Sequence, residues 1–114
     1  MIKIFGIKNC NTMQKAFEWL NNKGVVYEFI DYKKAGADKQ KIISWLAGKP
    51  LLEIINTKGT TLKKLSDEEK QILNNTEKGL ELVIKNPSMI KRPILELKNK
   101  ILIGFNESKW SESL

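Results

Sequence analysis

Hydrophobic and polar positions predict a strand, a helix and a second strand in the first third of the chain. Residues 1–5 predict a short strand, with Ile2 and Ile4 on one face. Residues 11–23 place apolar side chains at the i, i+3, i+4, i+7 spacing of one helix face. Residues 25–32 are rich in β-branched and aromatic side chains and predict the second strand. Short connections between these elements favour a parallel βαβ unit.

Polar residues mark where several helices begin or end. Asn11 or Thr12 is expected to cap the first helix, and Gly24 to end it in the left-handed conformation. Ser66 opens a capping-box sequence at the start of a later helix. Asn106 is expected to cap a terminal helix in the same way.

The middle of the chain, about residues 33–91, changes to helical periodicity. Helices are expected over 38–47, 66–74 and 76–85, with a short apolar helix or turn at 50–56 and a polar loop at 56–61. Two short apolar strands follow, at 93–97 and 100–104. Lys98 and Asn99 between them suit a turn, so this pair predicts an antiparallel hairpin.

The predicted order is β-α-β, helices, β-β, α, which is the thioredoxin order with a helical insertion. We therefore expect an α/β, thioredoxin-like fold with a mixed four-stranded sheet and an inserted helical subdomain. The chain is 114 residues long, which suits a single domain spanning 1–114. The core is expected at residues 1–32 and 92–114, and the insertion at about 33–91.

Charge narrows the choice of partners. Twenty Lys and Arg against thirteen Asp and Glu give a net charge of +7, but the basic residues are scattered along the chain among acidic ones. This pattern favours a solvated, lysine-coated surface, and no direct nucleic-acid partner is expected. No apolar run reaches the roughly 18 residues of a membrane span, and Lys3 interrupts the first one. A cytoplasmic location is the expectation.

The supply of reactive side chains is small, because histidine is absent and Cys10 is the only cysteine. This excludes an intramolecular disulfide, the usual Cys/His zinc site, and Ser-His-Asp or Cys-His catalysis. No metal and no bound cofactor are expected. Any catalysis must be carried by the thiol or by a carboxylate.

Cys10 is the candidate nucleophile. It lies between the first strand and the first helix, where a helix N-terminus stabilises a thiolate, and Lys8 adds positive charge nearby. The alternative is a buried structural cysteine, against which the polar loop argues. Met13 stands where a Cys-x-x-Cys motif has its second thiol, so an oxidised Cys10 needs an external thiol, such as glutathione or a glutaredoxin.

Arg92 is the only arginine of the chain and precedes Pro93 at the start of the third strand. A proline in this place is often cis, and Arg92 is then expected beside Cys10. There its planar fork of donors suits an oxyanion or a carboxylate of glutathione. The alternative is a surface arginine before an edge-strand proline.

Several segments match, in order and over nearly the whole chain, the motifs of one family. They are residues 6–16, 32–36, 56–61, 64–65, 86–87, 91–95 and 103–105. The sequence resembles the ArsC/Spx/YffB family of arsenate-reductase-like, thioredoxin-fold proteins, above all its YffB branch. The resemblance implies that Cys10 takes up an oxyanion or a glutathionyl group and that Arg92 helps to bind the anion. Two further arginines of the arsenate reductases have no counterpart here, and Lys58 is a partial substitute.

These observations together give the functional hypothesis. We expect a thiol oxidoreductase in which Cys10 and Arg92 are catalytic, and in which an external thiol resolves a mixed disulfide or oxyanion adduct. The expected substrate-binding residues are Lys8, Asn9, Asn11, Thr12, Lys58 and Pro93. The expected partners are glutathione, as co-substrate, or a glutaredoxin, and a small anionic substrate. The alternative is an Spx-like regulator that binds RNA polymerase without catalysis.

Overall fold

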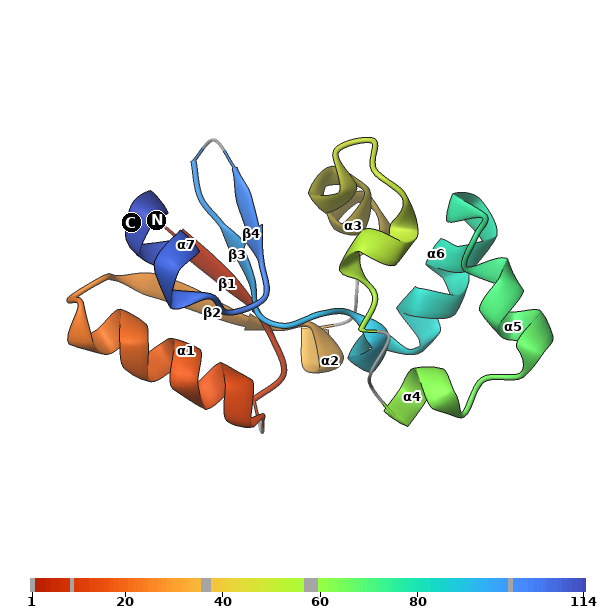
Figure 1. Ribbon diagram of the computed structural model, residues 1–114, viewed down its shortest axis with the longest axis horizontal. Helices are drawn as coiled ribbons and strands as arrows, with labels where there is room; N and C mark the ends of the chain where they lie inside the picture. Colours follow the sequence, from red (N-terminus) through yellow and green to blue (C-terminus); the bar gives the residue numbers. More distant parts are fainter. Residues whose placement is uncertain (1, 9, 36–37, 57–59, 99) are drawn as a thin grey trace. The chain divides into compact units, whose positions relative to one another are not determined.

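A computed structural model describes residues 2–8, 10–35, 38–56, 60–98 and 100–114. The chain divides into two compact units, one formed by Met1–Lys34 with Arg92–Leu114 and the other by Ala35–Lys91. The first unit holds the sheet, and the second is helical (Figure 1).

The sheet of the first unit has four strands in the order β2-β1-β3-β4. Their bounds are Ile2–Gly6 for β1, Tyr27–Asp31 for β2, Ile94–Glu96 for β3 and Ile101–Ile103 for β4. β1 pairs with β2 in parallel, whereas β3 is antiparallel to both β1 and β4. The predicted thioredoxin-like α/β fold, with a mixed four-stranded sheet and inserted helices, is therefore confirmed.

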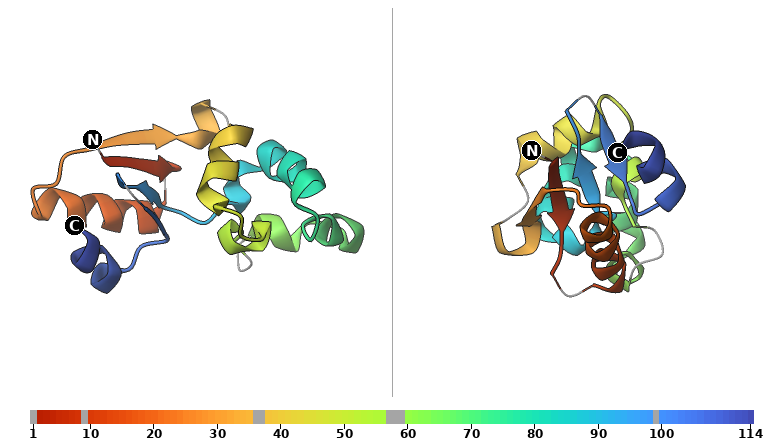
Figure 2. Two further views of the ribbon diagram at one scale, coloured as in Figure 1. Left: turned by 90° about the horizontal axis from the view of Figure 1, so that it is seen from above. Right: turned by 90° about the vertical axis from the view of Figure 1, so that its left-hand side faces the viewer.

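Two helices, α1 (Asn11–Asn22) and α7 (Glu107–Ser113), cover the same face of this sheet (Figure 2). Their buried core is formed by Ile4, Met13, Ala16, Leu20, Leu95 and Trp110. The Trp110 ring meets Trp19 and Phe105 edge-on, at centroid distances of 5.6 and 4.9 Å. Its indole N–H donates to the Gly104 carbonyl at 3.2 Å. Trp110 thus ties α7 to both α1 and the end of β4.

Strand register brings three chain segments to one end of the sheet. Gly6 and Asp31 are partners at the carboxyl ends of the parallel strands β1 and β2. β3 runs the opposite way, and its first residue, Ile94, pairs with Phe5. The residues that follow β1, those that follow β2 and those that precede β3 are therefore gathered at the same end.

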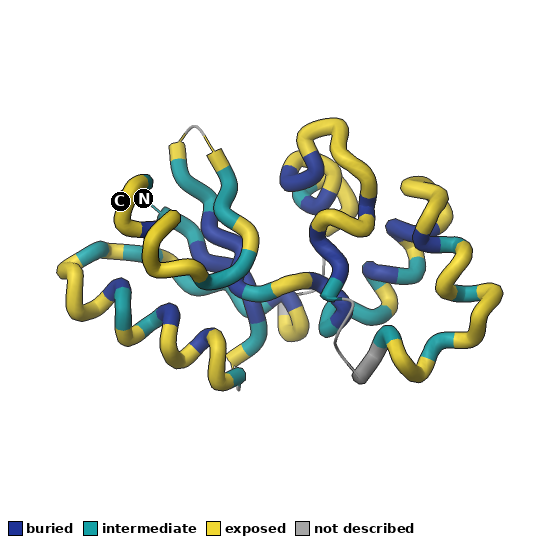
Figure 3. Tube along the Cα trace, viewed as in Figure 1, coloured by how far each residue is buried: buried dark blue, intermediate teal, exposed yellow. Residues whose placement is uncertain are grey.

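The second unit is built from short helices. They are α3 (Lys39–Leu46), η1 (Leu51–Ile54), α4 (Thr60–Lys63), α5 (Asp67–Ile72), α6 (Thr76–Lys85) and η2 (Pro87–Met89). Buried residues recur along these helices, as the dark blue parts of the tube in Figure 3 show, and they include Ile42, Trp45, Leu51, Leu80 and Val83. An isolated antiparallel bridge joins Ile55 to Ile90.

Most predicted helix ends are confirmed. Gly24 is left-handed, with φ 69°, directly after the C-cap of α1. Ser66 makes the complete capping box of α5, and Asn106 caps α7 through the Lys109 N–H at 3.0 Å. The hairpin of β3 and β4 forms as expected, while Asn99 of its turn lies outside the described residues.

Three sequence predictions are wrong in detail. The N-cap of α1 is Cys10 rather than Asn11 or Thr12, because Cys10 itself has an extended backbone, at φ −145° and ψ 131°, and the helical conformation begins at Asn11. Helix α4 begins at Thr60, inside the segment expected to be a loop. α6 ends at Lys85 as predicted, but the short helix η2 that follows it has no counterpart among the predicted helices.

The second strand is also shorter than predicted at both ends. The Val25 N–H bonds to the Leu20 carbonyl at 3.0 Å, so this residue belongs to the turn after α1. At the other end, the Asp31 carboxylate accepts from the N–H groups of Lys33 and Lys34, at 2.9 and 3.3 Å. Such capping starts helix α2 (Tyr32–Ala35), so Tyr32 begins a helix instead of ending a strand.

Removing the Trp110 side chain is expected to destabilise the first unit strongly. Trp110→Ala should lower the free energy of unfolding by about 3–5 kcal/mol, because the indole is fully buried. Trp110→Phe keeps most of the aromatic volume and should cost less, about 1–2 kcal/mol, for the lost N–H bond and the smaller ring. Urea unfolding measures both, with the exposed Lys109→Ala as control. Equal stability of Trp110→Ala and the control would contradict this role.

Candidate active site

Cys10 lies at the start of α1, on the segment that follows β1. It is half-buried against the core, and its carbonyl accepts the first bond of the helix from the Gln14 N–H at 3.0 Å. The close approach of β1 to this first turn depends on Gly6, since a Cβ there would overlap the sulfur and terminal methyl of Met13. Met13 is fully buried, so the turn that carries Cys10 is anchored directly to the sheet.

The surroundings of Cys10 favour its thiolate form. Burial alone would raise the pKa of the thiol, but interactions with the Met13 N–H, the Arg92 side chain and the Thr12 N–H lower it. The charge of Arg92 lowers it further, so the pKa of Cys10 lies below its ordinary value. The Cys10 side chain makes no N-capping hydrogen bond. The Thr12 and Met13 N–H groups therefore stabilise the thiolate as part of the positive end of the helix dipole.

Arg92 supplies the cation of the site. The side chain is half-buried and hydrogen-bonded to Cys10, and the peptide bond to Pro93 is cis, as predicted. Burial by itself would lower the pKa of the guanidinium, but the hydrogen bond to Cys10 and the contact with Tyr32 raise it above its usual value. Each partner thus stabilises the charged form of the other.

Tyr32 completes the group and was missed by the sequence prediction. It is only 2% exposed, and its side chain is hydrogen-bonded to Arg92. Burial raises the pKa of its phenol to about 12, although Arg92 acts in the opposite direction. The residue belongs to one of the motif segments, 32–36, but was assigned to a strand. The capping carboxylate of Asp31 was the local signal that a helix begins there.

The other predicted site residues are less closely grouped. Thr12 takes part through its backbone N–H, as described, whereas the Asn11 side chain is exposed and Pro93 is buried. Lys8 is exposed and lines a hollow of about 440 Å³ with Gln14 and three aromatic rings. Asn9 and Lys58 lie outside the described residues.

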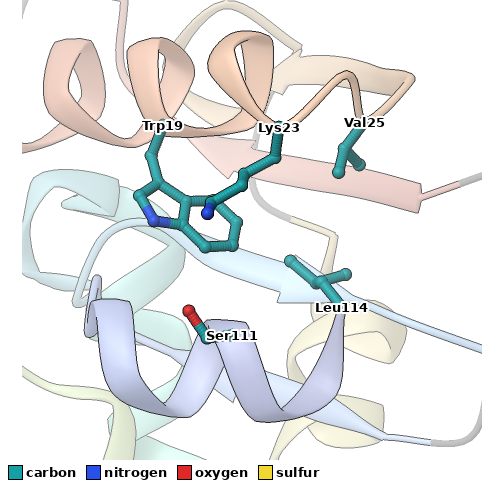
Figure 4. A pocket seen from close by; sticks show the side chains of 5 residues that line it. All are labelled: Trp19, Lys23, Val25, Ser111 and Leu114. Atoms are coloured by element: carbon teal, nitrogen blue, oxygen red, sulfur yellow. The ribbon is translucent and has the colours of Figure 1, made fainter.

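A smaller hollow of about 230 Å³ lies at the far end of α1 (Figure 4). Trp19 of α1 and the C-cap residue Lys23 line it together with Ser111 and Leu114 from the C-terminal segment. The Lys23 ammonium lies 5.8 Å from the Trp19 ring centroid. The twelve residues of α1 span about 18 Å. This hollow is therefore remote from Cys10 and is not part of the candidate site.

The described residues offer neither a metal-binding cluster nor a membrane-spanning helix. Within them, no group of three or more Cys, Asp or Glu side chains is arranged to hold a metal ion. Nor does any helix in these ranges have the length and apolar character needed to cross a membrane.

Comparison with known proteins gives consistent matches over the whole chain. The model of the ArsC family matches residues 5–113. A Haemophilus influenzae protein, described only as uncharacterized, is 34% identical over 110 residues, which is 96% of each chain. The solved structure of a protein called YffB is 39% identical, with a TM-score of 0.92, and the match covers 100% of this chain and 99% of that one.

A more distant match is the global transcriptional regulator Spx of Streptococcus agalactiae. It is 29% identical over 111 residues, covering 96% of this chain and 80% of the regulator.

The lowered pKa of Cys10 should make stability depend on pH. Between its folded pKa and the unfolded thiol pKa of about 8.5, the native state holds fewer protons than the unfolded state, so the free energy of unfolding rises with pH. This contribution is complete above the unfolded pKa and is lost as pH falls through the folded pKa. Urea unfolding from about pH 5 to pH 9 should show the rise in the wild type and a flatter profile in Cys10→Ser.

The sequence makes this comparison unusually clean. Histidine is absent, so no imidazole titrates in that window. The other titratable groups are present in both proteins and cancel in the difference. Parallel profiles for the wild type and Cys10→Ser would contradict the lowered thiol pKa.

Proposed function

We propose, from the premise that this chain belongs to the ArsC family, that it is a glutathione-dependent thiol oxidoreductase with Cys10 as nucleophile. It is an arsenate-reductase-like protein with a single cysteine. The observation that carries the proposal is the hydrogen bond between Cys10 and Arg92, together with the lowered pKa of the thiol. Thiolates, rather than thiols, attack disulfides and electrophilic oxyanions.

The proposed cycle has two exchange steps. The Cys10 thiolate attacks the glutathionyl sulfur of a mixed disulfide, the S–S bond breaks, and the substrate leaves as its thiolate. Glutathione thiolate then attacks the glutathionyl sulfur on Cys10, giving glutathione disulfide and regenerating the Cys10 thiolate. The net reaction consumes one mixed disulfide and one glutathione, and yields one reduced thiol and one glutathione disulfide. Since reduced thiols are maintained in the cytoplasm, we propose that the protein acts there.

Arg92 has two roles in this proposal. Its guanidinium stabilises the attacking and the leaving sulfur anion of Cys10, and its five N–H donors leave capacity for an anionic group of the substrate. A carboxylate of glutathione and a small oxyanion both fit this description. We therefore propose small oxyanions, which would form an adduct on Cys10, as the second substrate class.

Met13 supports the need for an external thiol. It occupies the position of the second sulfur in a Cys-x-x-Cys motif, and its fully buried thioether cannot resolve an adduct on Cys10. We propose glutathione or a glutaredoxin as the resolving partner.

A regulator that binds RNA polymerase without catalysis is the second candidate function, favoured by the match to Spx over 96% of this chain. Retention of RNA polymerase by the immobilised protein, without thiol-dependent turnover, would support it. Turnover that depends on Cys10, without such retention, would support the oxidoreductase.

Replacement of Cys10 should abolish the proposed chemistry. With glutathione disulfide, the wild type should gain one glutathionyl group by mass spectrometry and lose it again with reduced glutathione, whereas Cys10→Ser should gain none. Turnover should be measured on glutathionylated peptides and on arsenate with glutathione present. Unchanged turnover in Cys10→Ser would exclude the thiol mechanism.

Replacement of Arg92 tests the anion site separately. Arg92→Lys keeps the positive charge but loses the fork of donors, so we expect kcat/KM to fall by about tenfold or more. The neighbouring Lys91→Gln, an exposed side chain, removes a charge of the same sign and should leave kcat/KM within about twofold. Equal losses in both variants would indicate a general charge effect and contradict the assigned role.

A further inference from the structure

One buried titratable group near the site has no part in the cycle described above. Tyr32 is 2% exposed, yet its side chain is hydrogen-bonded to the Arg92 guanidinium. Burying a phenol hydroxyl costs free energy of folding unless the hydroxyl makes a hydrogen bond. This contact suggests that the residue serves the site rather than only the core.

The donor and the acceptor of the hydrogen bond between Arg92 and Tyr32 follow from the chemistry of the two groups. A guanidinium only donates hydrogen bonds, so the Tyr32 oxygen must accept from an Arg92 N–H. Because its pKa is about 12, the phenol stays uncharged over the physiological range. A neutral acceptor orients the guanidinium and leaves its positive charge uncompensated, whereas a carboxylate in the same place would neutralise that charge. The five donors of Arg92 allow it to bond Tyr32 and Cys10 together.

The sheet places the three side chains where this contact can form. Tyr32 directly follows β2, Cys10 lies on the segment after β1, and Arg92 precedes β3. β1 lies between β2 and β3 in the sheet, and all three segments are at the same end of it. The Arg92 guanidinium is therefore within reach of both the Cys10 thiolate and the Tyr32 phenol, each of which lies at the start of a helix.

We propose that Tyr32 is a positioning residue that holds the Arg92 guanidinium against the Cys10 sulfur and aims its other donors at the anionic group of the substrate. This inference rests on the proposed oxidoreductase function and adds to it a determinant of thiolate stability and of anion affinity. The titratable and charged groups that act on Tyr32 are Arg92, Cys10 and Asp31. Those that act on Cys10 are Arg92 and the N–H groups of Thr12 and Met13.

Tyr32→Phe tests the inference, because it removes one hydroxyl and keeps the ring. The rate of Cys10 alkylation by iodoacetamide should be measured against pH, and the single cysteine makes the rate specific. At about pH 6 we expect the rate of Tyr32→Phe to be about threefold to tenfold below that of the wild type, the range for one lost hydrogen bond. Above about pH 10 the two rates should converge, since both thiols are then ionised.

Tyr27→Phe is the matched control. Tyr27 is the other tyrosine of the unit, half-buried and stacked on Phe17 at 5.7 Å, and the same hydroxyl is removed. Its alkylation profile should coincide with that of the wild type. An equal shift in both tyrosine variants, or no shift in Tyr32→Phe, would overturn the inference.

A double-mutant cycle separates positioning from a structural role. In an Arg92→Gln background, Tyr32→Phe should no longer change the alkylation profile, because Tyr32 acts through the guanidinium. With the wild-type Arg92, Tyr32→Phe should also raise KM for a glutathionylated substrate more than it lowers kcat. A full effect of Tyr32→Phe without Arg92 would overturn the inference.

The wild-type protein provides a measurement that does not depend on a variant folding. Arg92 is the only arginine, so its guanidinium N–H groups give one set of side-chain NMR signals. A guanidinium held on two partners should rotate slowly and give resolved N–H signals that shift as Cys10 titrates. A single averaged signal, insensitive to pH, would overturn the inference.

These outcomes distinguish a failure of the proposed oxidoreductase function from a failure of the role proposed for Tyr32. An ordinary thiol pKa in the wild type would contradict the proposed function and this inference together. A lowered wild-type pKa that Tyr32→Phe leaves unchanged would overturn the role of Tyr32 alone.

Discussion

The contact between the Arg92 guanidinium and the Cys10 sulfur is the interaction on which the candidate site depends. Burial opposes the charged form of both groups, since desolvation raises the pKa of the thiol and lowers that of the guanidinium. Their mutual attraction, with backbone N–H groups at the sulfur, outweighs this cost. A sulfur in the same half-buried place without the arginine would have a higher pKa, because burial would be opposed by the backbone N–H groups alone.

The sheet makes this contact possible because it fixes residues that are far apart in sequence. Cys10 and Arg92 are separated by the entire second unit, yet each lies next to a paired strand. Gly6 allows β1 to approach the first turn of α1, and Trp110 holds α7 and α1 on the same face of the sheet. Strand pairing and core packing thus set the geometry of the site, while the loops contribute the reactive groups.

Local patterns explain what could be predicted from the sequence. The apolar stripe of α1, the capping box at Ser66 and the hairpin of β3 and β4 all depend on residues close together in the chain. The pairing of Cys10 with Arg92 was predictable only because the order of elements indicated a known fold. The role of Tyr32 was not, since it depends on where β2 ends, and capping by Asp31 decides that end. Asn11 was misassigned as a cap because the extended conformation of Cys10 is not encoded in its side chain.

The buried thioether of Met13 has a kinetic consequence for the proposed cycle. A protein with two neighbouring thiols expels its adduct by an internal collision, at a rate independent of its surroundings. Here the adduct on Cys10 leaves only when another molecule arrives, so its lifetime varies inversely with the concentration of that molecule. The fraction of chains that carry an adduct on Cys10 would then report the concentration of reducing thiols around the protein.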